Sequence, residues 1–212
     1  MKKKDLPTKI AVFPLSNAIF FPKTILPLNI FEKKYVQMVD DCMKENKLLG
    51  MVQPKIKKGS NMSVYSVGCL GKIINFNEVS DNMFLISLSG IIRFKIKEEL
   101  KTEKLYRKFK VDYADFFDDL EQKKEEQADT KKNLIKKIKV FLKNKNYEIQ
   151  FDKLEKLHFE QLLSTICMLG PFSEAEKQKL METIKIKDKI KVLEELISFN
   201  SINVSKTNYS IN

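Results

Sequence analysis

The chain has 212 residues, of which 43% are hydrophobic, and this is enough for one or two compact domains with real cores. No apolar run approaches the roughly 20 residues that a membrane-spanning helix needs. The start Met1-Lys2-Lys3-Lys4-Asp5 leads to Pro7 and not to an apolar signal core, so we expect a cytoplasmic protein that does not act in a membrane.

The formal net charge is +11, from 39 Lys and Arg residues against 28 Asp and Glu residues. A basic surface that attracts nucleic acid or acidic proteins is one interpretation. A genome-wide preference for AT-rich codons is the other, because such codons favour Lys, Ile and Asn together. Ile and Asn are also abundant here, which favours the compositional interpretation and leaves the first one open.

The residue types that hold metals and disulfides are scarce. Cys42, Cys69 and Cys167 are far apart and odd in number, so they predict neither a disulfide framework nor a metal site, and we expect reduced, buried thiols. His158 is the only histidine, which excludes a multi-histidine metal site. We therefore expect no metal and no cofactor.

From Lys9 to about Phe117 the chain consists of short segments rich in Val, Ile, Phe and Tyr, which predict strands. Prolines in the first two apolar runs favour positions near sheet edges, and Gly68 and Gly71 indicate a bulge or bend in a later one. The first four runs cover residues 10–15, 25–30, 48–53 and 67–76.

One helix is expected within this half, from Glu32 to Asn46, and it should lie on the sheet. Acidic and basic residues alternate with an apolar set at helical spacing. That set consists of Tyr35, Val36, Val39, Met43 and, less clearly, Cys42.

The next strands carry a clear period of two. Residues 83–89 alternate, and Ser80-Asp81-Asn82 before them tolerates positive φ, which predicts a β-hairpin. In residues 91–96, Ile92, Phe94 and Ile96 share one face while Arg93 and Lys95 share the other. Phe109, Val111 and Tyr113 repeat the alternation in a last strand, and strands of this length with one helix indicate a small, partly closed barrel.

The period changes to 3.6 after a polar stretch from Asp118 to Thr130, where we place the domain junction. Ser173 with Glu176 predicts a capping box, and Gly170-Pro171 predicts a helix end. We expect a β-barrel domain over 1–118, a helical bundle over 119–200 and a flexible tail over 201–212. The apolar stripes of the four expected helices are Leu134, Ile135, Ile138, Phe141 and Leu142; Leu154, Leu157, Leu162, Ile166 and Leu169; Leu180, Met181 and Ile184; and Ile190, Leu193, Leu196 and Ile197.

Several motifs in the first half follow one another in a family-specific order. Phe13-Pro14-Leu15, Phe20-Phe21-Pro22 and the run from Leu26 to Glu32 lead into the expected helix. Leu48 to Val52, Val67 to Ile73 and the step Gly90-Ile91-Ile92-Arg93-Phe94 follow in turn. In this order and spacing, the chain resembles the N-terminal substrate-binding domain of Lon proteases, and its helical half resembles the tail of stand-alone bacterial proteins of that family.

The resemblance implies an α+β fold, with a PUA-like, partly closed β-barrel carrying one helix and followed by a C-terminal helical bundle. It also implies a role in recognising protein segments. Two positions depart from the family pattern. Asp81-Asn82-Met83 stands where the family usually has Asp-Gly-Arg, and Lys33-Lys34-Tyr35 stands where it tends to have Pro-Arg-Tyr, so a lysine replaces the planar fork of an arginine.

The sequence offers no catalytic constellation. Residues 68–73 are too short between their glycines for a phosphate-binding loop, and Ile73 cannot bind magnesium. Asp118-Asp119 and Glu125-Glu126 lie in the polar stretch and are interpreted as solvated charge. We therefore expect a protein that is not an enzyme and that lacks the ATPase and Ser-Lys peptidase domains of Lon proteases.

We expect a binding module whose partners are unfolded or partner polypeptides, with a separate protease as one candidate partner. The proline-broken loop before the second strand cannot bury every aromatic in a sheet, which favours an exposed apolar patch. The candidate protein-binding residues are Phe20, Phe21, Pro22, Ile30, Phe31 and Tyr35. The opposing interpretation is that Phe20 and Phe21 close the end of the barrel.

An RNA-binding function is the alternative, because related folds bind RNA and the chain is basic. Lys72, Arg93 and Lys95 would then line one face of the sheet. Exposed aromatics do not alternate with basic residues along any one strand, although base stacking would require this.

Overall fold

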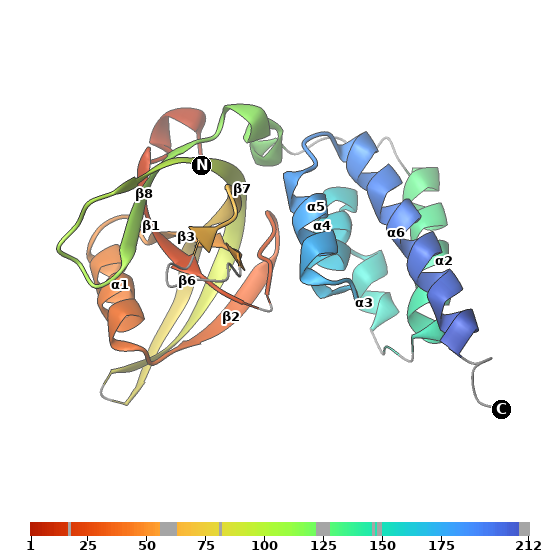
Figure 1. The fold of residues 1–212 in the computed structure, drawn as a ribbon, viewed down its shortest axis with the longest axis horizontal. Helices are drawn as coiled ribbons and strands as arrows, with labels where there is room; N and C mark the ends of the chain where they lie inside the picture. The colour runs from red at the N-terminus through yellow and green to blue at the C-terminus, as the bar shows by residue number, and fades with distance from the viewer. Residues whose placement is uncertain are drawn as a thin grey trace. The chain divides into compact units, whose positions relative to one another are not determined.

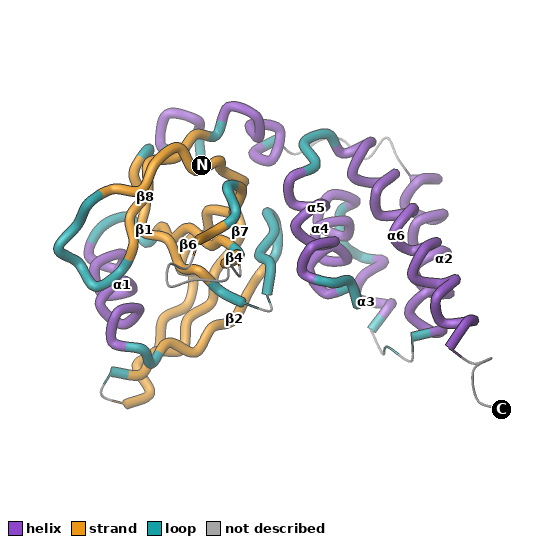
Figure 2. Tube along the Cα trace, in the orientation of Figure 1, coloured by secondary structure: helices purple, strands orange, loops and turns teal. Residues whose placement is uncertain are grey.

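The computed structural model describes residues 1–16, 18–55, 63–80, 82–121, 128–145, 147 and 150–207. The chain divides into two compact units, Met1–Gln122 and Lys123–Asn212. Strands form the first unit and helices the second (Figures 1 and 2). The junction expected at 118/119 stays a prediction, and the division between the units lies close to it.

The first unit is built on a six-stranded sheet in which five strands form a ring. The strand order is β2-β7-β6-β3-β1-β8, and β7 also pairs with β8, so β2 alone extends outside the ring. This confirms the expected partly closed barrel. The six strands are β1 (Lys9–Pro14), β2 (Ile25–Ile30), β3 (Leu48–Val52), β6 (Val67–Ser80), β7 (Met83–Leu100) and β8 (Arg107–Asp112).

Short elements complete the first unit. β4 (Pro54–Lys55) and β5 (Ser63–Val64) form a separate two-stranded sheet. The 3₁₀ helix η1 (Lys3–Asp5) precedes β1, and the 3₁₀ helix η2 (Ala114–Leu120) follows β8. A short 3₁₀ helix therefore lies before the first strand of the barrel and another after its last strand.

The long strand β7 pairs with two strands along one of its edges. Its first half pairs with β2, from Phe84 opposite Ile30 to Ser89 opposite Ile25. Its second half pairs with β8, from Lys95 to Leu100. Its other edge pairs with β6 from Met83 to Lys95, and one of the register shifts in this pairing lies beside Gly71 and Gly90. The bulge expected near Gly71 is confirmed.

The turn between β6 and β7 confirms the predicted hairpin. Ser80 pairs with Met83, and Asn82 adopts a φ of 63°, the left-handed conformation that an asparagine tolerates better than most residues. Asp81 lies outside the described residues. Asparagine therefore occupies this turn without a glycine.

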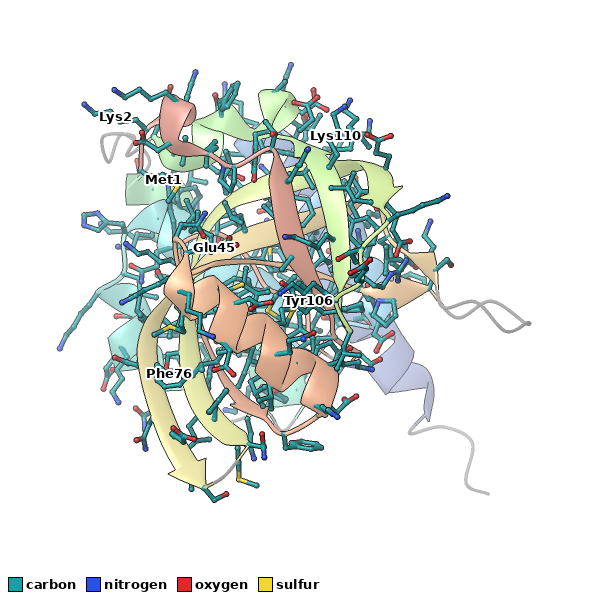
Figure 3. The ribbon with its side chains drawn as sticks, turned by 90° about the vertical axis from the view of Figure 1, so that its left-hand side faces the viewer. Met1, Lys2, Glu45, Phe76, Tyr106 and Lys110 are labelled. Atoms are coloured by element: carbon teal, nitrogen blue, oxygen red, sulfur yellow. The ribbon has the colours of Figure 1, made fainter. Side chains whose placement is uncertain are left out.

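The helix α1 (Lys33–Lys44) connects β2 to β3, while β1 and β3 pair in parallel. Its N-terminus lies one residue from the expected one and its C-terminus two. Val36, Val39 and Cys42 are buried as predicted, but Met38 is also fully buried, because the contact face of the helix is wider than the predicted stripe. Tyr35 and Met43 are half-buried. Figure 3 shows α1 in front of the strands of the barrel.

The prolines of β1 and β2 predicted that both strands lie at sheet edges, which is right for β2 and wrong for β1. β2 has a partner on one side only, as its proline favours. β1 lies between β3 and β8, inside the ring. Pro14 is tolerated there because it is the last residue of β1, where the ladder of backbone hydrogen bonds ends.

The second unit contains five helices within the described residues, since the second expected helix is divided near Leu157. Leu134, Ile138, Phe141 and Leu142 are buried as predicted, and so are Leu162, Leu180 and Leu193. The helices are α2 (Ala128–Asn144), α3 (Phe151–Glu155), α4 (Phe159–Leu169), α5 (Glu174–Glu182) and α6 (Ile186–Thr207).

The ends of these helices follow the sequence signals closely. α4 ends at Leu169, before Gly170, and the capping box of Ser173 and Glu176 opens α5. Ile184, expected to be buried, is 48% exposed because α5 ends two residues before it. α6 continues to Thr207, so the first part of the expected tail is helical, and residues 208–212 lie outside the described residues. Within the described residues, no helix is both long and apolar enough to cross a bilayer.

Candidate functional site

Four of the six predicted protein-binding residues are buried. Phe20 and Phe21 are 2% and 0% exposed, Ile30 is 1% exposed, and Pro22 is buried as well. The ring of Phe20 lies against Gly71, where an added Cβ would be 2.6 Å from a ring carbon, and the carbonyl oxygen of Phe21 would be 2.2 Å from a Cβ at Gly90. The exposure expected for Phe20 and Phe21 is wrong, because the ring of Phe20 packs over Gly71 and the backbone of Phe21 and Pro22 lies against Gly90, so this loop is buried against β6 and β7.

The other two predicted residues lie at the surface, at the start of α1. Phe31 is 63% exposed and precedes the helix by two residues. Tyr35 is half-buried, with its ring centroid 4.2 Å from that of Phe13 and the two rings tilted by 56°. The ammonium group of Lys34 lies 4.5 Å from the centre of the Tyr35 ring and 2.9 Å from a carboxylate oxygen of Glu32. An aromatic surface flanked by a paired charge therefore faces outward here.

Tyr35 forms one wall of an open groove of about 480 Å³. β1, the end of β7, the start of β8 and the connection between β7 and β8 supply the rest of the lining. Figure 3 labels Tyr106 beside α1 on this side of the barrel. The groove is lined by Val12, Pro14, Lys34, Tyr35, Glu99, Leu105, Tyr106 and Arg107.

The connection between β7 and β8 is fastened to α1 by three polar contacts. The backbone N–H of Leu105 donates to Oε1 of Gln37 at 2.9 Å. The hydroxyl of Tyr106 donates to Oδ2 of Asp41 at 2.9 Å, and Nζ of Lys104 lies 2.9 Å from the same oxygen. The side chain of Leu105 stays 54% exposed at the rim. The groove is therefore a fixed feature, with an apolar side chain on each wall.

These contacts shift the pKa values of the groups involved. The hydrogen bond from Lys104, followed by the one from Tyr106, lowers the pKa of Asp41, although burial opposes the shift. Burial first, and then the hydrogen bond to Asp41, raises the pKa of Tyr106. At neutral pH, Asp41 is thus a carboxylate that accepts and Tyr106 a phenol that donates.

Arg107 and Glu99 form a two-point ion pair at the outer end of the groove. Nε and a terminal nitrogen of Arg107 lie 2.7 Å from the two carboxylate oxygens of Glu99. The guanidinium carbon also lies 4.9 Å from the centre of the Phe109 ring. The hydrogen bonds from Arg107 lower the pKa of Glu99, so the pair stays charged at neutral pH. The groove thus combines an apolar centre with a rim of paired charges.

This arrangement suits binding. The charged side chains that line the groove form ion pairs, Lys34 with Glu32 outside the groove and Arg107 with Glu99. The described residues contain no cluster of His, Cys, Asp or Glu that could hold a metal ion. Sequence patterns had indicated Tyr35. They missed Leu105 and Arg107, because the connection that carries Leu105 has no periodicity, and nothing in the sequence showed that it folds against α1.

The residues of the RNA-binding alternative do not form one face. Lys72 and Lys95 are exposed, but Arg93 is 1% exposed. Its guanidinium is engaged by the carboxylate of Asp119, with Nε 2.8 Å from Oδ2. The placement expected for Arg93 on an open sheet face is wrong, because η2 covers that part of β7. Asp119 is likewise part of the barrel and not solvated charge.

Exposed apolar side chains also lie on the hairpin of β6 and β7, at Ile74, Phe76, Val79 and Leu85. Phe76 pairs with Ile86 and Leu85 with Asn77, so these two side chains lie on opposite faces of the hairpin. Phe76, labelled in Figure 3, lies 4.9 Å from the ring of the buried Phe84. Phe76, Phe31 and the groove therefore each present exposed apolar surface on the first unit.

The sequence model of the ATP-dependent protease La (LON) substrate-binding domain matches residues 9–198. The chain belongs to this family. A Lon protease from Anaeromyxobacter dehalogenans is 24% identical to it over 205 residues, and one from Dictyoglomus thermophilum is 25% identical over 195 residues. These matches cover 93% and 88% of this chain but 24% of each relative, so the chain spans about a quarter of the length of these LON-family proteases.

Solved LON-family structures have the same fold. The N-terminal domain of a Mycobacterium avium complex Lon protease matches with a TM-score of 0.66 and 16% identity, covering 90% of this chain and 98% of that domain. A Lon N-terminal domain protein from Xanthomonas campestris matches with a TM-score of 0.61 and 19% identity, covering 91% of this chain and 99% of that one. The barrel and the helices that follow it are thus matched together.

Proposed function

We propose that this chain is a recognition module that binds exposed apolar segments of unfolded or partner polypeptides, as an adaptor and not as a catalyst. Membership of a substrate-binding domain family supports recognition as its general role. The observation that carries the proposal is the groove beside Tyr35, with Phe31 exposed at the same end of α1.

The composition of the groove suits a polypeptide. Its apolar surface, from Pro14, Tyr35 and Leu105, can accept an aliphatic or aromatic side chain, and its paired charges form a polar rim. Protein-binding surfaces commonly combine an apolar centre with such a rim. The volume of about 480 Å³ also falls within the roughly 300–1,000 Å³ of typical ligand sites.

The affinity of such a groove for any one side chain is low. Burying one large apolar side chain stabilises a complex by about 1.5–3 kcal/mol, which is less than the cost of association. Useful affinity therefore requires several contacts at once, and the exposed rings of Phe31 and Phe76 can supply two of them. This favours long unfolded clients over short peptides.

The test is binding of a fluorescently labelled, reduced and carboxymethylated protein that cannot refold, at low and moderate salt. The variant Phe31→Ser/Leu105→Ser removes two exposed apolar side chains at the groove. We expect its affinity to fall by at least about five-fold, because two apolar contacts are lost. Binding by the unmodified chain should persist as salt is raised.

The matched control is Phe199→Ser, which removes an aromatic side chain of the same type with nearly the same exposure, 62% against 63% for Phe31, but lies in the second unit. An equal loss of affinity in both variants would show that any exposed aromatic side chain contributes to nonspecific binding, and this would contradict the proposal. Salt-sensitive binding of an RNA pool that exceeds polypeptide binding would favour the RNA alternative instead. A candidate protease partner can be tested afterwards by the same variants.

A further inference from the structure

Helix α2 carries a second groove, unrelated to the one beside Tyr35. One side of α2 buries Leu134, Ile138 and Phe141 in the bundle. The opposite side borders an open groove of about 650 Å³. It is lined mainly by Lys131, Lys132, Ile135, Lys136, Lys139 and Val140.

The groove carries a surplus of positive charge. Glu155 also lines it and forms an ion pair with Lys139. Within the part of the chain that the structure describes, neither Lys132 nor Lys136 forms an ion pair. Like charges four residues apart on a helix destabilise it, and these two lysines have that spacing. An anionic partner would relieve this repulsion.

The groove also holds apolar surface among the lysines. Val140 is 58% exposed and Ile135 is half-buried. A phosphate backbone gains nothing from covering these two side chains, and the lining offers no aromatic ring or arginine on which a base could stack. Acidic side chains interspersed with aliphatic ones complement both parts of the groove.

We infer that the α2 groove is a docking site for an acidic, amphipathic polypeptide segment of a partner protein. Its carboxylates face Lys132 and Lys136, and an aliphatic side chain covers Val140. This goes beyond the proposed recognition of apolar clients, because it uses the second unit and selects by charge. The site would let the module hold one partner while the barrel binds another.

The test uses the full chain and three fluorescent probes. The first is a peptide of 17 residues, the length of α2, in which glutamates alternate with leucines at helical spacing. The second has the same leucines with serine in place of glutamate, and the third is a single-stranded RNA of equal charge. Affinities are measured by anisotropy at low and moderate salt.

The test variant is Lys132→Glu/Lys136→Glu. Its matched control is Lys72→Glu/Lys95→Glu, which changes the net charge equally at exposed positions of the first unit. We expect the acidic peptide to bind about ten-fold more weakly to the test variant and unchanged to the control, since two attractive contacts become repulsive. A third variant, Val140→Asn, should weaken peptide binding without affecting the weak electrostatic binding of RNA.

Three results would overturn the inference. If both charge variants lose affinity equally, the attraction comes from net charge and not from this groove. If the serine peptide binds as well as the glutamate peptide, charge does not select the ligand. If RNA binds more tightly than the peptide and is lost in the test variant, the groove is a nucleic-acid site. Thermal unfolding of each variant confirms that the helices are intact.

Discussion

Arg93 on β7 and Asp119 in η2 form a buried ion pair with two parallel contacts, 2.8 Å from Nε to Oδ2 and 2.8 Å from a terminal nitrogen to Oδ1. The backbone N–H of Arg93 also donates to Oδ2, at 3.0 Å. The guanidinium carbon lies 4.6 Å from the centre of the Phe116 ring, which also belongs to η2. The segment after the last strand is therefore fastened to the outside of the barrel.

Removing the carboxylate should be costly, because it leaves the charge of Arg93 buried without its partner. Arg93 and Asp119 have side chains that are 2% and 12% exposed. We expect Asp119→Ala to lower the free energy of unfolding by about 3–5 kcal/mol, the usual cost of breaking a buried pair. Urea unfolding followed by circular dichroism measures this. The control is Asp115→Ala, at an exposed position of the same 3₁₀ helix, with an expected change within about 0.5 kcal/mol.

Phe21 and Phe31 should behave oppositely although both were candidate binding residues. Phe21 is fully buried, so Phe21→Ala should destabilise the chain by about 3–5 kcal/mol through lost burial and the cavity left behind. Phe31→Ala removes an exposed ring and should change stability by less than about 0.5 kcal/mol. Denaturant midpoints distinguish the two. A small effect at Phe21 would contradict its place in the core.

The thiols should be unreactive while the chain is folded. Cys42, Cys69 and Cys167 are all buried, and burial raises the pKa of Cys42 to about 12, with smaller contributions from Glu45 and Asp41. Because the thiolate is the reactive form, a thiol reagent at neutral pH should label the folded chain slowly. In denaturant, all three should react quickly. Fast labelling of Cys42 in the native chain would show that α1 opens readily.

Asp41 should contribute a stability that disappears in acid. Its pKa is lowered in the folded chain from the ordinary 3.8, first by the hydrogen bond from Lys104. A lowered folded pKa gives a stabilisation that is complete above the unfolded value and is lost as the pH falls through the folded one. The stability difference between the unmodified chain and Asp41→Asn should therefore be constant near neutral pH and shrink below about pH 4. A constant difference down to strong acid would contradict the assignment.

Local patterns predicted the elements well, because each pattern depends on a geometry that near neighbours decide. The alternation of Phe109, Val111 and Tyr113 places all three in the core, and the turn at Asn82 depends on a single left-handed residue. The alternation of side chains did not predict the burial of Arg93. Alternation shows on which face of a strand a side chain lies, but it does not show which other segment covers that face. The covering segment, η2, is separated from Arg93 by more than 20 residues.

The candidate site was harder to predict than the fold. Tyr35 could be found because it opens a helix with a clear apolar stripe. The facing wall could not, because Leu105 is positioned by a backbone hydrogen bond to Gln37, 68 residues away in sequence. Phe20 and Phe21 were misjudged because a loop with prolines can be covered by the rest of the barrel as well as by a partner. Gly71 leaves room for the ring of Phe20, and Gly90 leaves room for the backbone of Phe21 and Pro22.

The ring of strands also sets the order in which the chain can fold as it leaves the ribosome. β1 pairs on one side with β8, where Lys9 lies opposite Lys110. The first strand therefore cannot complete its pairing until roughly 100 more residues have been synthesised. At about 5–20 residues per second, this delay lasts about 5–20 seconds. During that time one edge of β1 has no strand to pair with, although β3 can already pair with the other. In the second unit the separation is shorter, because Lys137 of α2 binds Glu194 of α6, 57 residues later, so an incomplete barrel lasts longer during synthesis than an incomplete bundle.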